Sequence, residues 1–181
     1  MIRFAVAALS MVACTVIGAV PLSAKDSLGV FSGWAAFRDA APARCYAIAQ
    51  PQRERDSEPF ASVSNWPDRG VRGQLHIRMS RSVSEGAYVG LTVGSRRFVL
   101  AANGHNAWAK DARMDAAILA ALRSADAMRI SARGANGVRF VDRYDLAGAA
   151  TAIDAAIVGC IQRNRSAANR ERIPGGADRA R

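Results

Sequence analysis

The sequence contains few of the residues from which catalytic and metal sites are built. Its 181 residues include only two histidines and three cysteines. His76 and His105 lack the short helical spacing of paired metal ligands, so we expect both at the surface and predict no metal and no cofactor. No serine occupies a Gly-x-Ser-x-Gly motif and no cysteine–histidine nucleophile can be assigned, so the sequence predicts a protein that is not an enzyme.

Lysine is scarce, although the chain is strongly basic. There are 25 lysines and arginines against 15 acidic residues, a net charge of +10, and only Lys25 and Lys110 are lysines. A charge of this size invites a nucleic-acid interpretation. However, the arginines alternate with apolar residues along single strands and do not cluster with aromatic side chains. We therefore do not expect nucleic acid as a partner.

Long apolar runs are confined to the N-terminus. Arg3 precedes an apolar run over residues 4–20, which is followed by Pro21 and by the small residues Ser23 and Ala24. This order is typical of a cleavable secretory signal rather than a lasting membrane span. We therefore expect a signal peptide at residues 1–24 and a periplasmic or secreted protein.

A competing interpretation treats Cys14 as a lipidated N-terminus. The segment Met11–Cys14 then serves as a lipoprotein signal. Its first position is methionine rather than the usual leucine, and the apolar run continues past Cys14. The sequence therefore favours cleavage after Ala24.

Signal removal leaves two cysteines, Cys45 and Cys160. In an oxidising compartment such a pair normally forms a disulfide. The alternative is a pair of buried free thiols. A redox-active pair is disfavoured because the sequence has no Cys-x-x-Cys motif.

The apolar residues of the mature chain follow two periods. Met114, Ile118 and Leu122 recur at helical spacing after a capping Asp111, and Ile153, Ile157 and Cys160 do the same after Asp145. Elsewhere the period is two, which indicates half-buried strands. We expect these strands at residues 30–38, 44–49, 60–66, 74–81, 87–93, 96–101, 128–133 and 138–140.

These elements predict a mainly β fold with two helices (α+β), an antiparallel β-sandwich-like single domain over residues 25–161. Gly33 and Trp34 fall inside the first expected strand, where Trp34 reads as a core aromatic. Residues 103–106 are expected to turn, and Asn136-Gly137 to close a hairpin. Residues 162–181 lack an apolar period and predict a basic, disordered tail.

Two groups of aromatic and polar residues could form an interaction surface. Trp66, Tyr88 and Trp108 offer stacking rings for a small-molecule or glycan-binding module, one alternative function. Arg143 and Tyr144 form a second local group, although this segment also joins the last strand to its helix. A third possibility is a hydrolase whose histidine and acid meet only in the folded chain.

Together, several segments resemble the invasion-associated locus B family. They are Gly33-Trp34, the following Cys45, RGQLHIRMSR over residues 72–81, and FVDRYDLAGAATAID over residues 140–154. The resemblance spans residues 30–160. It implies an exported, largely β, sandwich-like domain of alphaproteobacteria, genetically associated with pathogen entry into red cells and without a known enzymatic reaction.

The chain departs from the family pattern in its cysteines. Typical members carry a cysteine shortly after the tryptophan and a further pair in mid-chain, which are missing here. The disulfide pattern therefore differs. We expect an exported cell-envelope protein without enzymatic activity, which acts by interacting with envelope or host components.

The signal peptide can be tested directly. We expect mature protein recovered from cells to begin at or near Lys25, because signal peptidases cut after small residues such as Ala24. N-terminal sequencing measures this, and the variant Ala24→Leu should slow processing. An intact Met1 or a lipid-modified Cys14 would contradict it.

Overall fold

The computed structural model describes residues 25–53 and 58–171, and the side chains of the last helix as far as Gln162. The expected signal peptide, residues 1–24, and residues 172–181 of the expected tail lie outside the described residues.

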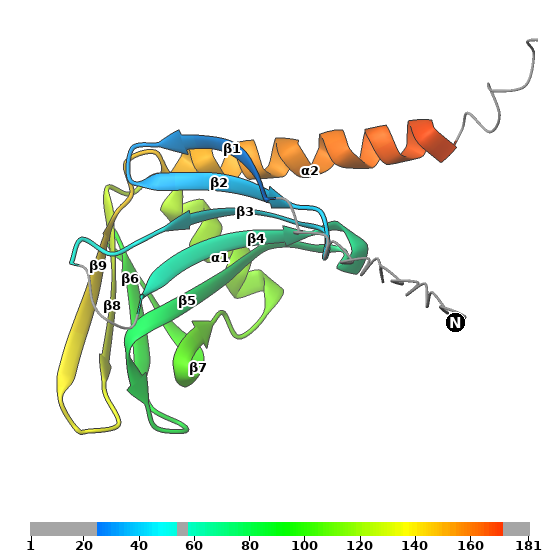
Figure 1. Cartoon of the computed structure of the whole chain (residues 1–181). Helices are drawn as coiled ribbons and strands as arrows, with labels where there is room; N and C mark the ends of the chain where they lie inside the picture. Colours follow the sequence, from blue (N-terminus) through cyan, green and yellow to red (C-terminus); the bar gives the residue numbers. More distant parts are fainter. Residues whose placement is uncertain (1–24, 54–57, 172–181) are drawn as a thin grey trace, which may run out of the picture.

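Nine strands form an antiparallel sheet, and two helices pack against it (Figure 1). The strand order across the sheet is β1-β2-β3-β4-β5-β7-β6-β8-β9. This arrangement confirms the expected mainly β, α+β class. The strands are β1 (Lys25–Phe31), β2 (Trp34–Asp39), β3 (Arg44–Ala49), β4 (Phe60–Trp66), β5 (Val71–Val83), β6 (Val89–Val93), β7 (Arg96–Trp108), β8 (Ala127–Arg133) and β9 (Arg139–Asp145), with a short 3-10 helix at Pro67–Arg69.

The sheet bends along β7, so that β6, β8 and β9 stand away from β1–β4 (Figure 1). One end of β7 pairs with β5, and the other end pairs with β6. Gly104, with a φ of +55°, pairs with Val83 of β5 next to a register break in that strand. The expected turn at residues 103–106 is therefore wrong, because glycine's positive φ bends the strand there without ending it.

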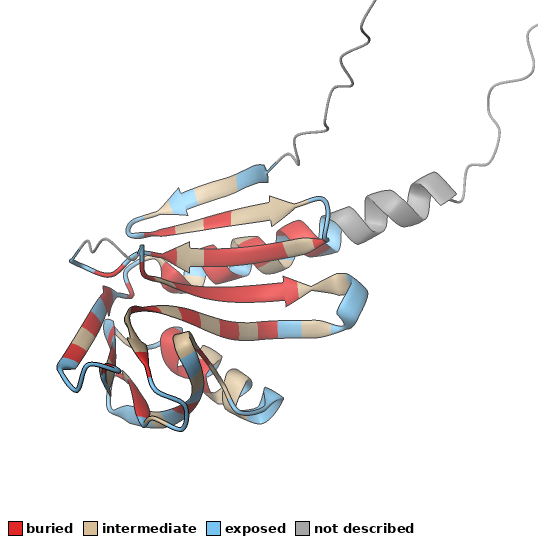
Figure 2. Ribbon diagram, turned by 60° about the horizontal axis from the view of Figure 1, so that its bottom comes forward, coloured by how far each residue is buried: buried red, intermediate tan, exposed pale blue. Residues whose placement is uncertain are grey.

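The two helices cover different parts of the bent sheet. Helix α1 (Ala112–Leu122) packs on β5, β6 and β7, whereas α2 (Ala149–Glu171) packs on β1–β4. Small buried residues, among them Ala47, Ala61 and Ala156, let α2 approach the sheet closely. Figure 2 shows that the buried residues concentrate on β3, β4 and the sheet-facing side of α2. Neither helix in the described part of the chain is long and apolar enough to cross a membrane.

The helix boundaries partly follow the sequence signals. Asp111 caps α1 as expected, because its side chain accepts a hydrogen bond from the Met114 N–H at 2.8 Å. Asp145 does not cap α2. It accepts from the Ala147 N–H at 2.8 Å and so holds the turn before the helix.

Gly148 completes the turn before α2. A Cβ there would lie 2.0 Å from the Phe31 carbonyl oxygen, so only glycine fits. Helix α2 also continues past Gln162 to Glu171, into the stretch where we expect a tail. Arginine, glutamine and alanine favour helix even without an apolar face, which accounts for this difference.

The first expected strand is instead a hairpin. Ser32 and Gly33 form the turn between β1 and β2, and Ser32 has a φ of +54°. Trp34 is a core residue as expected, only 1% exposed. Its indole Nε1–H donates to the Asp145 carbonyl at 2.9 Å, which joins β2 to the end of β9.

The expected disulfide is present. Cys45 on β3 and Cys160 on α2 are bonded, with their Cα atoms 5.7 Å apart. Both residues are buried. The bond therefore fastens the C-terminal helix to the middle of the sheet.

We expect Cys160→Ser to lower the free energy of unfolding of the mature protein by a few kcal/mol, below the roughly 4–5 kcal/mol of ideal loop closure. The disulfide restrains the unfolded chain, and the serine variant loses this restraint. Urea denaturation measures the change, and reductant should destabilise the wild type but not the variant. Equal stability of wild type and variant would contradict this expectation.

Candidate functional site

The outer face of the β8–β9 hairpin carries two pairs of facing arginines. Arg133 lies opposite Arg139, and Arg129 lies opposite Arg143. The alternating inward residues of β8, such as Met128 and Ile130, are buried in the core. All four arginines are consequently exposed.

Facing arginines are unfavourable within the protein alone. Like charges directly opposite each other on antiparallel strands destabilise the sheet. Within the described residues, no carboxylate forms an ion pair with any of these four side chains. An anion bound between the members of a pair would offset their repulsion, which makes this face our candidate site.

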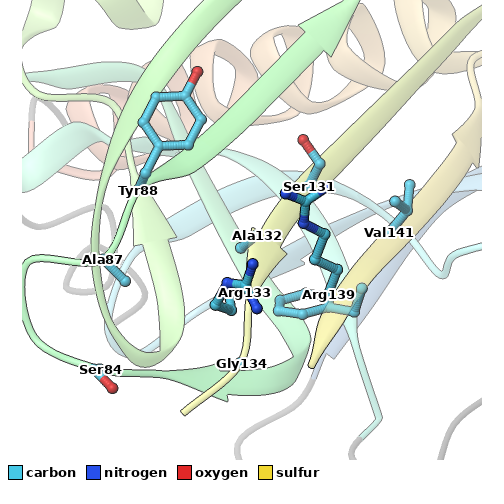
Figure 3. Close-up of a pocket in the computed structure, with 10 residues that line it drawn as sticks. Ser84, Ala87, Tyr88, Ser131, Ala132, Arg133, Gly134, Arg139 and Val141 are labelled. Atoms are coloured by element: carbon cyan, nitrogen blue, oxygen red, sulfur yellow. The ribbon is translucent and has the colours of Figure 1, made fainter. Parts of the chain in front are cut away.

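The first pair borders a cavity of about 730 Å³, which we call the distal hollow (Figure 3). Arg133, Arg139, Ser131 and Tyr88 contribute to its wall. Tyr88 is 67% exposed. The Arg139 side chain extends toward Ser131, and the Tyr88 ring lies on the other side of the hollow (Figure 3).

Gly90 leaves room for the Tyr88 ring. A Cβ at Gly90 would lie 3.1 Å from a Tyr88 ring carbon and 3.3 Å from the Ser131 hydroxyl oxygen. The ring therefore lies against the backbone of β6, beside Ser131. This position leaves an aromatic wall and a hydroxyl group next to the two guanidinium groups.

The second pair borders a cavity of about 390 Å³, the proximal hollow. Arg129, Arg143 and Thr92 contribute to its wall, together with Gln52 and Asp126. The Gln52 N–H donates to the Arg143 carbonyl at 2.8 Å, so the loop after β3 forms one side. Guanidinium groups bind carboxylates and phosphates in bidentate geometry, so the arginines of both hollows can bind an anion, although the Asp126 carboxylate opposes this at the proximal hollow.

A buried carboxylate holds the hairpin in place. Asp142 on β9 is 3% exposed and accepts a hydrogen bond from the Ser80 N–H at 2.8 Å, and a second from the Ser80 hydroxyl. The Ala135 N–H, in the hairpin turn, donates to the Ser82 carbonyl at 2.8 Å. The edge strand β9 is thereby joined to β5.

The strand alternation separates Arg143 from Tyr144, which the sequence places together. Arg143 is on the outer face, whereas the Tyr144 side chain is 0% exposed. Burial, and then the nearby charge of Asp142, raise the pKa of the Tyr144 phenol. Its hydroxyl has no hydrogen-bond partner among the described residues. Tyr144 is therefore a core residue that reaches the wall of the proximal hollow from the buried side.

The two tryptophans of the expected surface lie elsewhere. Trp108 stacks on His76, with ring centroids 5.7 Å apart and planes 9° from parallel. The guanidinium groups of Arg44 and Arg69 lie 5.2 and 4.9 Å from the Trp66 ring centroid. Both rings thus contact neighbouring side chains, and neither tryptophan is among the residues that line the two hollows. Of the five expected residues, Tyr88 lines the distal hollow, and Arg143 and Tyr144 line the proximal hollow.

The histidines are half-buried rather than exposed as expected. His76 Nε2 lies 2.9 Å from Asn106 Oδ1, and His105 Nδ1 lies 3.1 Å from the Met79 carbonyl oxygen. Cross-strand packing of neighbouring rings covers His76, a contact that depends on register.

A hydrolase that used one of these histidines would need it to activate a nucleophile. His105 and Ser80 do line a common cavity of about 340 Å³. The Ser80 hydroxyl, however, donates to Asp142, whereas a serine nucleophile passes its proton to a histidine. Among the described residues, no three His, Cys, Asp or Glu side chains are grouped to hold a metal.

The facing of the arginines is the feature that the sequence interpretation missed. Arg133 and Arg139 are equally far from Asn136, and so are Arg129 and Arg143. A hairpin centred on that turn pairs these arginines, so their equal spacing about Asn136 is a sequence signal for the two facing pairs. Comparisons with protein-family models, curated proteins and solved structures find no match to this chain.

We expect Asp142→Ala to lower the free energy of unfolding by about 3 kcal/mol, because it removes the buried carboxylate that accepts from the Ser80 N–H and hydroxyl. The matched control is Asp154→Ala, which removes an exposed ion pair with Arg123 and should cost less than about 1 kcal/mol. Chemical denaturation of both variants measures the difference. Equal losses would show that Asp142 does not anchor the hairpin.

Proposed function

We propose that this chain is an exported, non-enzymatic protein of the cell envelope that binds an anionic envelope or host-surface component. The observation that carries the proposal is that Arg133 and Arg139 lie directly opposite each other on β8 and β9, at the wall of the distal hollow. Neither forms an ion pair with a carboxylate among the described residues, so their guanidinium groups can bind a carboxylate or phosphate.

The disulfide supports an oxidising compartment. Disulfides persist in secreted and periplasmic proteins and are rare in the cytosol. The Cys45–Cys160 bond therefore agrees with removal of residues 1–24 as a signal peptide. The resemblance to invasion-associated locus B proteins points to the same oxidising compartment and to a role in interaction with other components.

The chemistry of the distal hollow supports binding over catalysis. Its described polar side chains are arginines and hydroxyl groups, namely Arg133, Arg139, Tyr88, Ser84 and Ser131. General acid–base catalysis needs a group whose pKa lies near the working pH. Histidine, aspartate and glutamate are the usual general bases, and none is among the described residues that line this hollow, so its wall can bind an anion but supplies no such base.

A narrower alternative is a periplasmic small-molecule or glycan-binding module. The exposed Tyr88 ring beside the hollow favours it, because a sugar or another ring can pack on an aromatic face. This alternative uses the same site and differs only in the size of the ligand. A hydrolase has less support, because Ser80 donates to Asp142.

Citrate, a small polycarboxylate, is a suitable first probe. We expect it to bind the wild type at low salt, and Arg133→Gln/Arg139→Gln to weaken binding by about tenfold or more, because charge-assisted hydrogen bonds are lost. Isothermal titration calorimetry measures the dissociation constants. Without ligand, the double variant should be at least as stable as the wild type, since a like-charge contact is removed.

The matched control is Arg72→Gln/Arg113→Gln, which removes two exposed arginines outside the hairpin. This variant lowers the net charge by the same amount and should bind citrate within about twofold of the wild type, since distant exposed charges are screened. Equal weakening in both double variants would show that only the overall charge matters. That result would contradict the proposed site.

A further inference from the structure

The two hollows lie along one face of the same hairpin. Arg129 and Arg133 both belong to β8, four residues apart in the strand, and their partners on β9 keep the same offset. At about 3.3 Å per residue, the two arginine pairs are separated by roughly 13 Å. The outward residues between the two pairs are Ser131 and Val141, which are uncharged.

We propose that the ligand is a linear acidic polysaccharide that lies along the hairpin and occupies both hollows. This inference rests on the proposed function, because it names the ligand class of the same site. One anionic group would enter the distal hollow between Arg133 and Arg139. Another would enter the proximal hollow between Arg129 and Arg143.

The separation of the pairs favours a chain over a small anion. A single carboxylate or phosphate reaches one pair and leaves the repulsion of the other pair in place. A polymer with repeated charges offsets both repulsions, and its second contact forms at high effective concentration. The two separate hollows therefore fit a ligand with at least two spaced anions.

The side chains near and between the two arginine pairs favour a ligand that contains sugar rings. The Ser131 hydroxyl can donate to or accept from a sugar hydroxyl, and Tyr88 presents an exposed ring beside it. Thr92, which lies opposite Arg129 on β6, adds a hydroxyl at the proximal hollow. A neutral stretch with hydroxyl groups thus connects two cationic positions.

Other polyanions fit this spacing less well. A nucleic-acid strand carries a phosphate at every nucleotide, which is a denser charge than two pairs about 13 Å apart. Binding of single strands also uses several stacking aromatics, whereas Tyr88 is the one aromatic among the described residues of this face that is largely exposed. A lipid surface contacts protruding groups, but these arginine pairs border hollows.

Hyaluronan fragments test the inference, because each disaccharide carries a single carboxylate. The full chain, expressed for export, is titrated with labelled hyaluronan disaccharide and octasaccharide, and fluorescence polarisation measures binding. We expect the octasaccharide to bind about a hundredfold more tightly, because it can engage both hollows at once. Dextran, a neutral polymer, should not bind.

The deciding variant is Arg129→Gln/Arg143→Gln, which alters only the proximal hollow. It should bring octasaccharide affinity close to that of the disaccharide while leaving disaccharide binding at the distal hollow within about twofold. Arg72→Gln/Arg113→Gln should keep the full preference for the longer fragment. Melting curves verify that each variant is folded.

The outcomes separate this inference from the proposed function. Equal binding of the two fragments, or an unchanged preference in Arg129→Gln/Arg143→Gln, overturns the polysaccharide inference but leaves the anion site intact. Citrate binding without hyaluronan binding would likewise overturn the polysaccharide inference and leave the anion site intact. Tighter binding of single-stranded DNA or of phosphatidylglycerol vesicles, lost in the same variants, assigns the face to that other ligand and also overturns the inference.

Discussion

The hydrogen bonds between Asp142 and Ser80 fix which side of β9 faces the core. A strand alternates its side chains, so placing one carboxylate inside determines the direction of every neighbour. With Asp142 inside, Phe140 and Tyr144 also face the core, and Arg139 and Arg143 face outward. A slip of one residue would bury the arginines and expose the aromatic rings. The candidate site therefore depends on a buried interaction on the opposite face.

The buried face and the outer face of the β8–β9 hairpin contribute to stability with opposite signs. Ile130 and Met128 of β8 are almost fully buried, and their burial contributes favourable free energy. The facing arginines on the other side of the same strands oppose it. A well-packed inner face lets the hairpin tolerate this repulsion, and a bound anion would remove it. Strain of this kind at a surface often accompanies binding.

Local patterns predicted the features that depend on nearby residues. The period-two strands, the Asp111 cap and the α+β class all follow from such patterns, and the disulfide follows from the compartment and the cysteine count. The start of α2 was less predictable, because distant parts of the chain meet there. Gly148 must be glycine because Phe31 lies against it, and no local pattern of Leu146-Ala147-Gly148 reveals that contact.

The candidate site was predictable only in part, for the same reason. Residue type pointed to Tyr88 and Arg143, and both line the hollows of the candidate site. Tyr144 was included because it adjoins Arg143 in sequence, although adjacent residues of a strand point to opposite sides. The arginine pairs needed the register of β8 and β9, which is a property of two strands together. Register is set by the hairpin turn and the buried face jointly.

If the chain is exported as we propose, the positions of its two cysteines set the order in which they leave the membrane. Cys45 lies on the third strand, and its partner Cys160 is 115 residues further along the chain, in the middle of the last helix. In the exported chain that we propose, Cys45 emerges from the membrane long before Cys160 can reach it. Residues 25–171 hold no third cysteine that could capture Cys45 within the chain in the meantime. Oxidation within one such mature chain can therefore yield only the Cys45–Cys160 pairing.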